Sequence, residues 1–164
     1  MNKNKVLLLS IMMSLFLNTV VVNAVPIELS WGTVIPTTRS TQIYGGAIAS
    51  NGDIIVVGHR TSGSQIDGYV LRVTSEGEIV WEETYGGDDA DRLKQVVSCD
   101  DGSFIAVGYT DSSGLGEDDG WIIKIDSDGN LLWEVTSGGS GSDGLYDAVL
   151  LEWICYRGRS SNLE

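Results

Sequence analysis

The chain has 164 residues, of which 23 are Asp or Glu and 10 are Lys or Arg, so its formal net charge is −13 at pH 7. Nucleic acids and anionic lipid surfaces are bound through clustered Lys and Arg, and this charge therefore argues against both as partners. Glycine is abundant, with 21 residues, whereas the 2 prolines both lie before residue 37. The rest of the chain has the composition of strands joined by tight turns.

The first 24 residues have the features of an export signal. Lys3 and Lys5 precede an apolar stretch, and Val22 and Ala24 occupy the −3 and −1 positions of a small-residue cleavage site. Polar residues interrupt this stretch, which makes it short for a membrane span of about 20 residues. We therefore predict a signal peptide at 1–24, cleavage after Ala24, and a secreted, cell-surface or periplasmic location. No membrane insertion is expected after cleavage, and the loss of two lysines brings the formal charge to −15.

Residues 51–87 and 101–139 are two copies of one repeat. Their matched glycines and tryptophans are offset by 50 residues in the first part and 52 in the second: Gly52 with Gly102, Gly58 with Gly108, Gly68 with Gly120, Gly77 with Gly129, and Trp81 with Trp133. Trp31 lies 50 residues before Trp81 and marks an earlier copy. The sequence thus predicts a repeat region over 25–164, with units at about 31–80, 81–132 and 133–164, the last one partial.

Within a copy, apolar residues follow the period of two that is typical of strands. The segments are rich in Val, Ile and aromatic residues and are bounded by Asp, Gly, Ser or Asn, which predicts strands at 92–99, 104–110, 120–126 and 131–137. No amphipathic helix pattern accompanies them. Four antiparallel strands in 40–50 residues are typical of a β-propeller blade. We therefore predict an all-β fold made of antiparallel four-stranded blades of an incomplete β-propeller, with about two blades and a partial third.

The predicted connections fall into two groups. Short Asp-Gly and Gly-Asn turns at 99–103 and 127–130 predict tight hairpins at one end of the unit. Longer connections at 85–91, 109–120 and 137–144 then lie at the other end, where binding loops are often found. We interpret their acids as a candidate binding face, with a merely solvated set of loops as the alternative. The acids are Asp88, Asp89, Asp91, Asp111, Glu117, Asp118, Asp119 and Asp143.

The segment DSDGN at 126–130 has the oxygen-rich composition of a calcium loop. An EF-hand loop requires Gly at its sixth position and Glu at its twelfth, between two helices. Here Gly129 is fourth, Ser137 is twelfth, and the flanking segments are strand-like. We interpret DSDGN as a hairpin turn and expect no cofactor or metal site, apart from calcium held loosely by the acidic loops.

Catalytic patterns are scarce. His59 is the one histidine, and no nucleophile elbow or phosphate-binding glycine loop is present. The adjacent acids Asp118 and Asp119 lie in a predicted surface loop and are weak evidence for glycosidase chemistry. We therefore expect no catalytic residues and no enzyme activity in this chain.

The full motif resembles a known family. The order GG-x3-D, then DG with an apolar run and VG, then K-x-D-x-x-G-x-x-x-W is similar to exported bacterial and archaeal β-propeller repeat proteins, which are grouped with the quinoprotein-like (PQQ-like) superfamily. The resemblance covers about residues 31–150 and implies structural roles for Trp81, Trp133, Gly77 and Gly129, with each tryptophan packing on the next blade. Quinone binding in that superfamily uses a complete ring, which two blades do not supply.

Two functions follow as hypotheses. The first is a non-catalytic exported module with a binding or structural role at the cell surface or outside the cell, its partner an unknown protein or glycan. The second is a remnant of a quinoprotein-like dehydrogenase or a propeller hydrolase. Both derive from the resemblance and from the scarcity of catalytic patterns.

The third unit begins well and then departs from the repeat. Residues 137–149 match 85–97, but EWICYRG at 152–158 replaces the Asp-Gly turn and apolar run. Truncation of a longer propeller, self-association through open blade edges and a capping segment all remain open. Cys99 and Cys155 suit a disulfide in an exported protein, but sequence alone leaves their pairing open because it does not fix the Cα separation.

Overall fold

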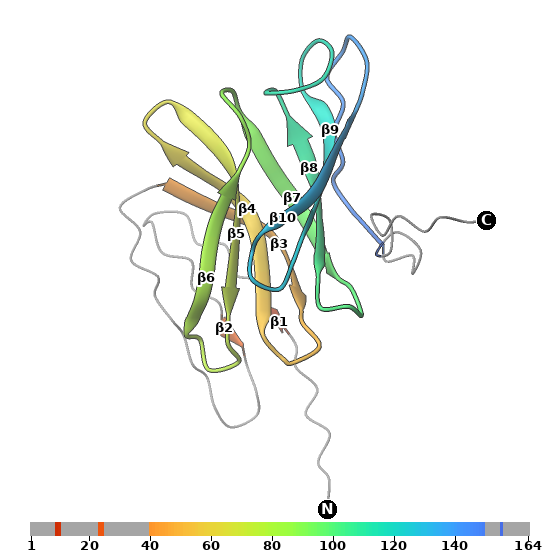
Figure 1. Ribbon diagram of the computed structural model, residues 1–164. Coiled ribbons are helices and arrows are strands. Elements are labelled where there is room, and N and C mark those ends of the chain that lie inside the picture. The colour runs from red at the N-terminus through yellow and green to blue at the C-terminus, as the bar shows by residue number, and fades with distance from the viewer. Residues whose placement is uncertain (1–8, 11–22, 25–39, 150–154, 156–164) are drawn as a thin grey trace, which may run out of the picture.

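The computed structural model describes residues 9–10, 23–24, 40–149 and 155 (Figure 1). Every element within these ranges is a strand, as the period-two pattern predicts, and none of their residues forms a helix long and apolar enough to cross a membrane. The strands are β1 (Leu9–Ser10), β2 (Asn23–Ala24), β3 (Ser40–Ile48), β4 (Ile54–Ser62), β5 (Gln65–Val73), β6 (Ile79–Tyr85), β7 (Asp91–Ser98), β8 (Phe104–Thr110), β9 (Asp119–Ile125) and β10 (Leu131–Ser137).

Two four-stranded antiparallel sheets dominate the fold. The first has the order β3-β4-β5-β6 and the second β7-β8-β9-β10, so each sheet is a continuous piece of chain in which neighbours in sequence are neighbours in space. A short antiparallel pair, β1 with β2, is separate from both. The all-β fold and its antiparallel four-stranded sheets are as predicted. The boundary between the two sheets lies between residues 85 and 91. The sheets therefore do not begin where the predicted units begin, which is at the tryptophans. Trp31 and most of the predicted signal peptide lie outside the described residues.

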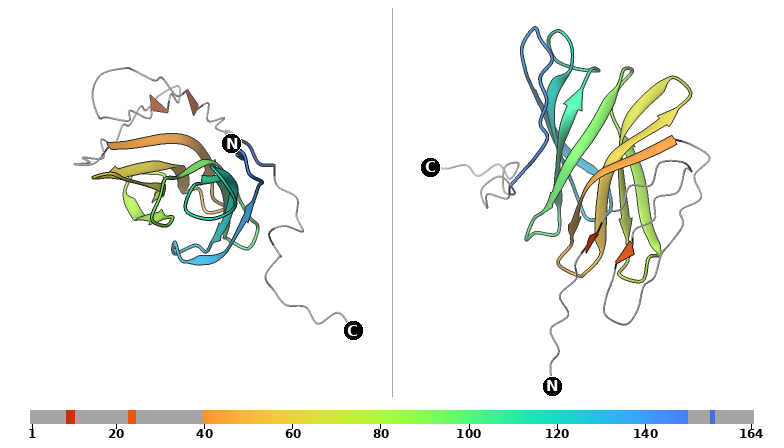
Figure 2. Two further views of the ribbon diagram at one scale, coloured as in Figure 1. Left: turned by 90° about the horizontal axis from the view of Figure 1, so that it is seen from above. Right: turned by 180° about the vertical axis from the view of Figure 1, so that it is seen from behind.

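The four hairpins that follow β3, β5, β7 and β9 close in the same way. At the turn after β3, the Ala49 N–H donates to the Asp53 carbonyl at 2.8 Å and the Gly52 N–H donates to the Ala49 carbonyl at 2.9 Å. The three turns after β5, β7 and β9 repeat this pair of bonds, and each has its glycine at a positive φ. A three-residue loop with glycine in the left-handed region is a common hairpin closure. These four hairpins lie at one end of the sheets, and the connections after β4, β6 and β8 lie at the other (Figure 2).

The core lies between the two sheets. Ile55, Val57 and Val70 of the first sheet are buried in one cluster with Phe104, Ala106, Trp121 and Ile123 of the second, and β7 lies against β3, β4 and β5. We call the face of the first sheet that packs on the second sheet, and the equivalent face of the second sheet, their forward faces. The forward face of the second sheet carries a smaller cluster of Ile105, Val107 and Trp133 with Leu145, Ala148 and Cys155 from the chain after β10.

One connection differs from the repeat. The second sheet joins β8 to β9 through a loop at 111–118, but the first joins β4 to β5 through Gly63 and Ser64 alone. β4 and β5 are each two residues longer than β8 and β9, so that their ladder continues to the pair Ser62 and Gln65. The two-residue turn that remains is possible because Gly63 adopts a φ of 66°. The long, acid-rich loop predicted at 109–120 thus joins β8 to β9, and it has no counterpart between β4 and β5.

Candidate functional site

Asp91, predicted to lie on an exposed acidic face, is fully buried at the start of β7. Its Oδ2 accepts a hydrogen bond from the Gly87 N–H at 2.8 Å and another from Ser112 Oγ at 2.8 Å. Gly87 lies in the crossing from the first sheet and Ser112 in the loop after β8. The carboxylate thus ties two loops together, which accounts for the GG-x3-D motif.

Asp119 has the same arrangement at the start of β9. It is buried, and its Oδ2 accepts from the Leu115 N–H at 2.6 Å, four residues earlier. Asp143, which is exposed, accepts from the Gly139 N–H at 2.8 Å with identical spacing. A carboxylate that accepts a backbone N–H in this way orders the loop locally. Asp91 and Asp119 therefore correct the sequence interpretation: they are buried loop anchors rather than members of a binding face.

The other acids of the predicted face remain near the surface. Asp88, Asp89, Asp111 and Glu117 are exposed, and Asp118 is half-buried with its carbonyl accepting from the Asp143 N–H at 2.6 Å. Among the described residues, no group of three or more His, Cys, Asp or Glu side chains is arranged to hold a metal ion. One buried oxygen of Asp91 and one of Asp119, Oδ1 in each, has no hydrogen-bond partner there. Loosely held calcium stays a prediction.

The DSDGN turn is a contact point between the sheets as well as a hairpin. Trp81 of β6 donates its indole N–H to the Ser127 carbonyl at 2.9 Å, and Arg72 Nη1 donates to the same oxygen at 2.6 Å. Tyr85 donates its hydroxyl to the Gly129 carbonyl at 2.6 Å. Three side chains of the first sheet therefore hold one turn of the second.

The carboxylate of Asp126 holds this turn in shape. It accepts from the backbone N–H groups of Asp128 at 2.9 Å and Asn130 at 2.8 Å. Partial burial opposes ionisation, but the hydrogen bond from the side-chain amide of Asn130 and these backbone bonds outweigh it, so the pKa of Asp126 lies below its usual value. The carboxylate oxygens of Asp126 therefore form hydrogen bonds within the turn itself.

Trp133 occupies the same repeat position on the second sheet. It is half-buried and packs in the cluster of Cys99, Ile105, Val107 and Cys155. Its indole N–H is buried and has no partner among the described residues. The two tryptophans therefore share a position in the repeat but differ in their hydrogen bonding.

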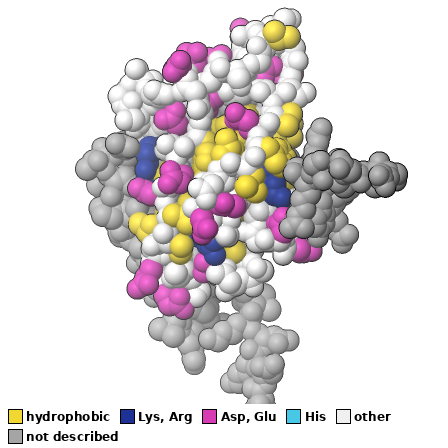
Figure 3. Space-filling view, viewed as in Figure 1, with side chains coloured by type: hydrophobic (Ala, Val, Ile, Leu, Met, Phe, Trp, Pro, Cys, Tyr) yellow, Lys and Arg dark blue, Asp and Glu magenta, His cyan; other side chains and the backbone are white. Residues whose placement is uncertain are grey.

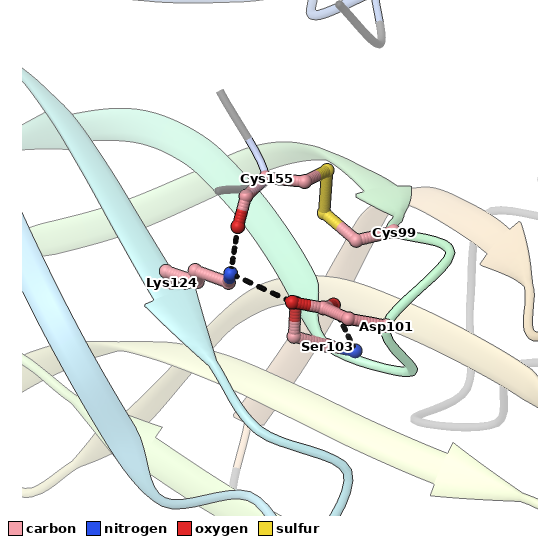
Figure 4. The surroundings of a disulfide bond; sticks show 5 residues. All are labelled: Cys99, Asp101, Ser103, Lys124 and Cys155. Carbon is pink, nitrogen blue, oxygen red and sulfur yellow. Dashed lines mark hydrogen bonds and ion pairs between the residues drawn. A yellow bond between two sulfur atoms is a disulfide. The ribbon is translucent and has the colours of Figure 1, made fainter. Parts of the chain in front are cut away.

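Cys99 and Cys155 form a disulfide, with their Cα atoms 5.8 Å apart (Figure 4). Lys124 lies beside it, donates to the Cys155 carbonyl, and pairs with Asp101 at 3.1 Å. Partial burial opposes ionisation of Asp101, but hydrogen bonds from Ser103 and the charge of Lys124 outweigh it, so the pKa of Asp101 is lowered. The sequence left the pairing of the two cysteines open, and the structure shows that they are bonded to each other. The remainder of 150–164 lies outside the described residues.

A basic and aromatic cluster, absent from the sequence interpretation, lies where the first strands of the two sheets meet. It contains Tyr44, His59, Arg92, Lys94, Tyr109 and Tyr146. A sequence clue exists in retrospect: Tyr44, Lys94 and Tyr146 occupy one position of the repeat, offset by the same 50 and 52 residues as the glycines. We call these six residues the inner-edge cluster.

Comparisons with known proteins identify no family. No protein-family model matches the chain, and no curated protein matches it significantly.

Proposed function

We propose that this chain is a non-catalytic, exported repeat module whose two sheets are successive blades of a β-propeller-type array. Its role is to bind or to support a protein or glycan at the cell surface or outside the cell. The observation that carries the proposal is the repeated way in which one unit packs on the previous one.

That packing is visible at two matched glycines. A Cβ placed on Gly68 would lie 3.0 Å from Cγ of Leu93, the residue that starts the second sheet's packing on the first. A Cβ on Gly120 would lie 3.2 Å from Cγ of Leu145, which is offset from Leu93 by the same 52 residues. The Leu145 N–H also donates to the Gly108 carbonyl at 3.1 Å. The matched contact of Leu145 with Gly120 supports the proposal that the chain after β10 packs on the second sheet as β7 packs on the first.

The surface supports a binding or structural role more than a catalytic one. Acidic side chains are spread over the face shown in Figure 3, and hydrophobic side chains gather near its middle. Three of the loop acids, Asp91, Asp119 and Asp143, accept hydrogen bonds from backbone N–H groups of their own loops. These three carboxylates therefore stabilise the conformations of their loops.

Export is supported by the disulfide, since such bonds persist chiefly in oxidising compartments. The test is expression of the full chain in a bacterium with an intact secretion pathway. We expect protein outside the cytoplasm that begins at Val25 by mass spectrometry and has no free thiol. An Ala24→Arg variant, which disrupts the −1 position, is the matched control and should accumulate uncleaved. Wild-type protein that stays in the cytoplasm with both thiols free would contradict the proposal.

A further inference from the structure

The inner-edge cluster is built on two β-bulges at equivalent positions. In β3 the pairing with β4 shifts between Ile43 and Gly45, and in β7 the pairing with β8 shifts between Leu93 and Gln95. The bulged residues are Tyr44 and Lys94. A bulge leaves one residue out of the ladder and redirects its side chain, and bulges are frequent beside functional sites. The same irregularity in both copies brings these two side chains together.

Aromatic rings surround the cations of the cluster. Lys94 Nζ lies 3.6 Å from the ring centroid of Tyr44 and 5.1 Å from that of Tyr109. The guanidinium of Arg92 lies 5.6 Å from the Tyr109 centroid, and the rings of Tyr109 and Tyr146 are 6.1 Å apart. Cation–π contacts of this kind stabilise a positive charge without neutralising it.

These two cations differ from the others in the described part of the chain. Arg60 pairs with Glu82, Arg72 with Asp53 and Lys124 with Asp101. Arg92 and Lys94 form no ion pair with any described residue, although Asp and Glu greatly outnumber Lys and Arg in the chain. Burial, and then the charge of Arg92, lower the pKa of Lys94. Two neighbouring positive charges without a counterion are costly unless an anion joins them.

His59 borders the same place. Its ring centroid is 5.6 Å from that of Tyr44, its side chain is buried, and its Nδ1 has no hydrogen-bond partner among the described residues. Burial first, and then the charges of Arg92 and Lys94, lower the pKa of His59. Neutralising those charges would therefore favour the protonated imidazole.

We propose that the inner-edge cluster binds a carboxylate-bearing saccharide, with the carboxylate between Arg92 and Lys94 and the sugar ring against Tyr44 and Tyr146. Guanidinium and ammonium groups form charge-assisted hydrogen bonds with carboxylates. Tyr44 is 41% exposed and Tyr146 is 69% exposed, so both rings are accessible to a ligand. The net charge of −13 disfavours a polyanion, and a single carboxylate on a sugar ring suits two cations beside open rings. This inference rests on the proposed binding role and is independent of the number of blades.

The single histidine makes a direct test possible. In histidine-detected NMR of the full chain, every imidazole signal belongs to His59. Three probes are titrated: glucuronate (ring and charge), glucose (ring alone) and acetate (charge alone). We expect glucuronate to raise the pKa of His59 and to saturate at lower concentration than acetate, while glucose has no effect on the pKa.

Matched variants locate the site. Lys94→Gln or Arg92→Gln should weaken glucuronate binding roughly tenfold or more, since hydrogen bonds to charged groups contribute most strongly. Lys94→Arg keeps the charge and should retain binding. Tyr146→Ala, at an exposed position, should reduce glucuronate affinity to that of acetate. Without ligand, Lys94→Gln should raise the pKa of His59, because it removes a repelling charge. Melting temperatures confirm that each variant is folded.

Several results would overturn the inference. They are no glucuronate-dependent change in His59, equal responses to glucuronate and acetate, or unchanged binding in folded Lys94→Gln. A protein that is exported and disulfide-bonded but indifferent to glucuronate would overturn this inference and leave the proposed function standing. Failure of export with intact glucuronate binding would do the reverse.

Discussion

The forward faces of the two sheets start from the same repeat and are completed differently. On the first sheet, Trp81 donates its indole N–H to the Ser127 carbonyl of the next unit. On the second, Trp133 is covered by Leu145, Ala148 and Cys155, and its indole N–H has no described partner. One face is closed by hydrogen bonds to a turn and the other by a disulfide. In these two copies the packing tryptophan therefore has the same position, but the contacts that it makes differ.

The largest expected effect is on the disulfide-closed face. Replacing both Cys99 and Cys155 by Ala frees a loop whose ends are 56 residues apart in sequence. In the chain-entropy account this lowers the free energy of unfolding by about 4 kcal/mol. Urea denaturation of both proteins measures it, with and without reductant. Reductant should leave the free energy of unfolding of the variant unchanged and should lower that of the wild type to the same value. A wild type that is equally stable with and without reductant would contradict the disulfide.

The hydrogen-bonded face is tested by a pair of glycines in equivalent turns. Gly129 has φ 88°, and a Cβ there would lie 3.2 Å from the Trp81 ring; Gly102 has φ 81° and open space around it. Ala at Gly102 should cost only the left-handed backbone, about 1 kcal/mol. Ala at Gly129 adds displacement of Trp81, for about 3 kcal/mol in total.

Thermal or urea unfolding of the two variants measures this difference. Equal destabilisation of Gly129→Ala and Gly102→Ala would mean that the contact between Trp81 and the DSDGN turn contributes little to stability.

The two tryptophans provide a smaller contrast. Trp81→Phe removes the hydrogen bond to Ser127 and should lower stability by about 1 kcal/mol beyond the loss of ring area. Trp133→Phe removes a buried N–H that has no described partner, so the loss of ring area should be offset and the net change should be near zero. Unfolding curves for both variants decide the matter. The reverse ranking would show that the indole N–H of Trp133 is satisfied in solution.

The smallest effect concerns pH. Because the pKa of Asp101 is lowered in the folded state, the stability from its bonds to Ser103 and Lys124 is complete above its unfolded pKa and is lost as pH falls through the folded pKa. Asp101→Asn should therefore be less stable than wild type near pH 6, with the difference shrinking below about pH 4. Melting temperatures across this range measure it. Asp100→Asn, at the exposed neighbouring acid, is the control and should show a smaller difference.

Much of the fold followed from local patterns in the sequence. The four strands predicted for the second sheet begin and end within one residue of β7 to β10, because alternation and turn glycines act over a few residues. The candidate site followed less well. The eight acids were grouped by loop, but Asp91 and Asp119 are turned inward to bind backbone N–H groups. A carboxylate's direction depends on the next loop's path, and alternation does not carry that information.

By itself, the sequence determined the all-β class, the repeat, the strand limits and the position of the tight hairpins, since each depends on neighbours a few residues away. Only the tertiary structure decided which long-range pairs form. It joined Cys99 to Cys155, placed Trp81 on the Ser127 carbonyl and brought Lys94 over Tyr44. All three contacts connect residues that are 46 to 56 positions apart in sequence, and they depend on how the segments pack. Their partners are fixed by the packing of one unit on the next, a relation that no single segment contains.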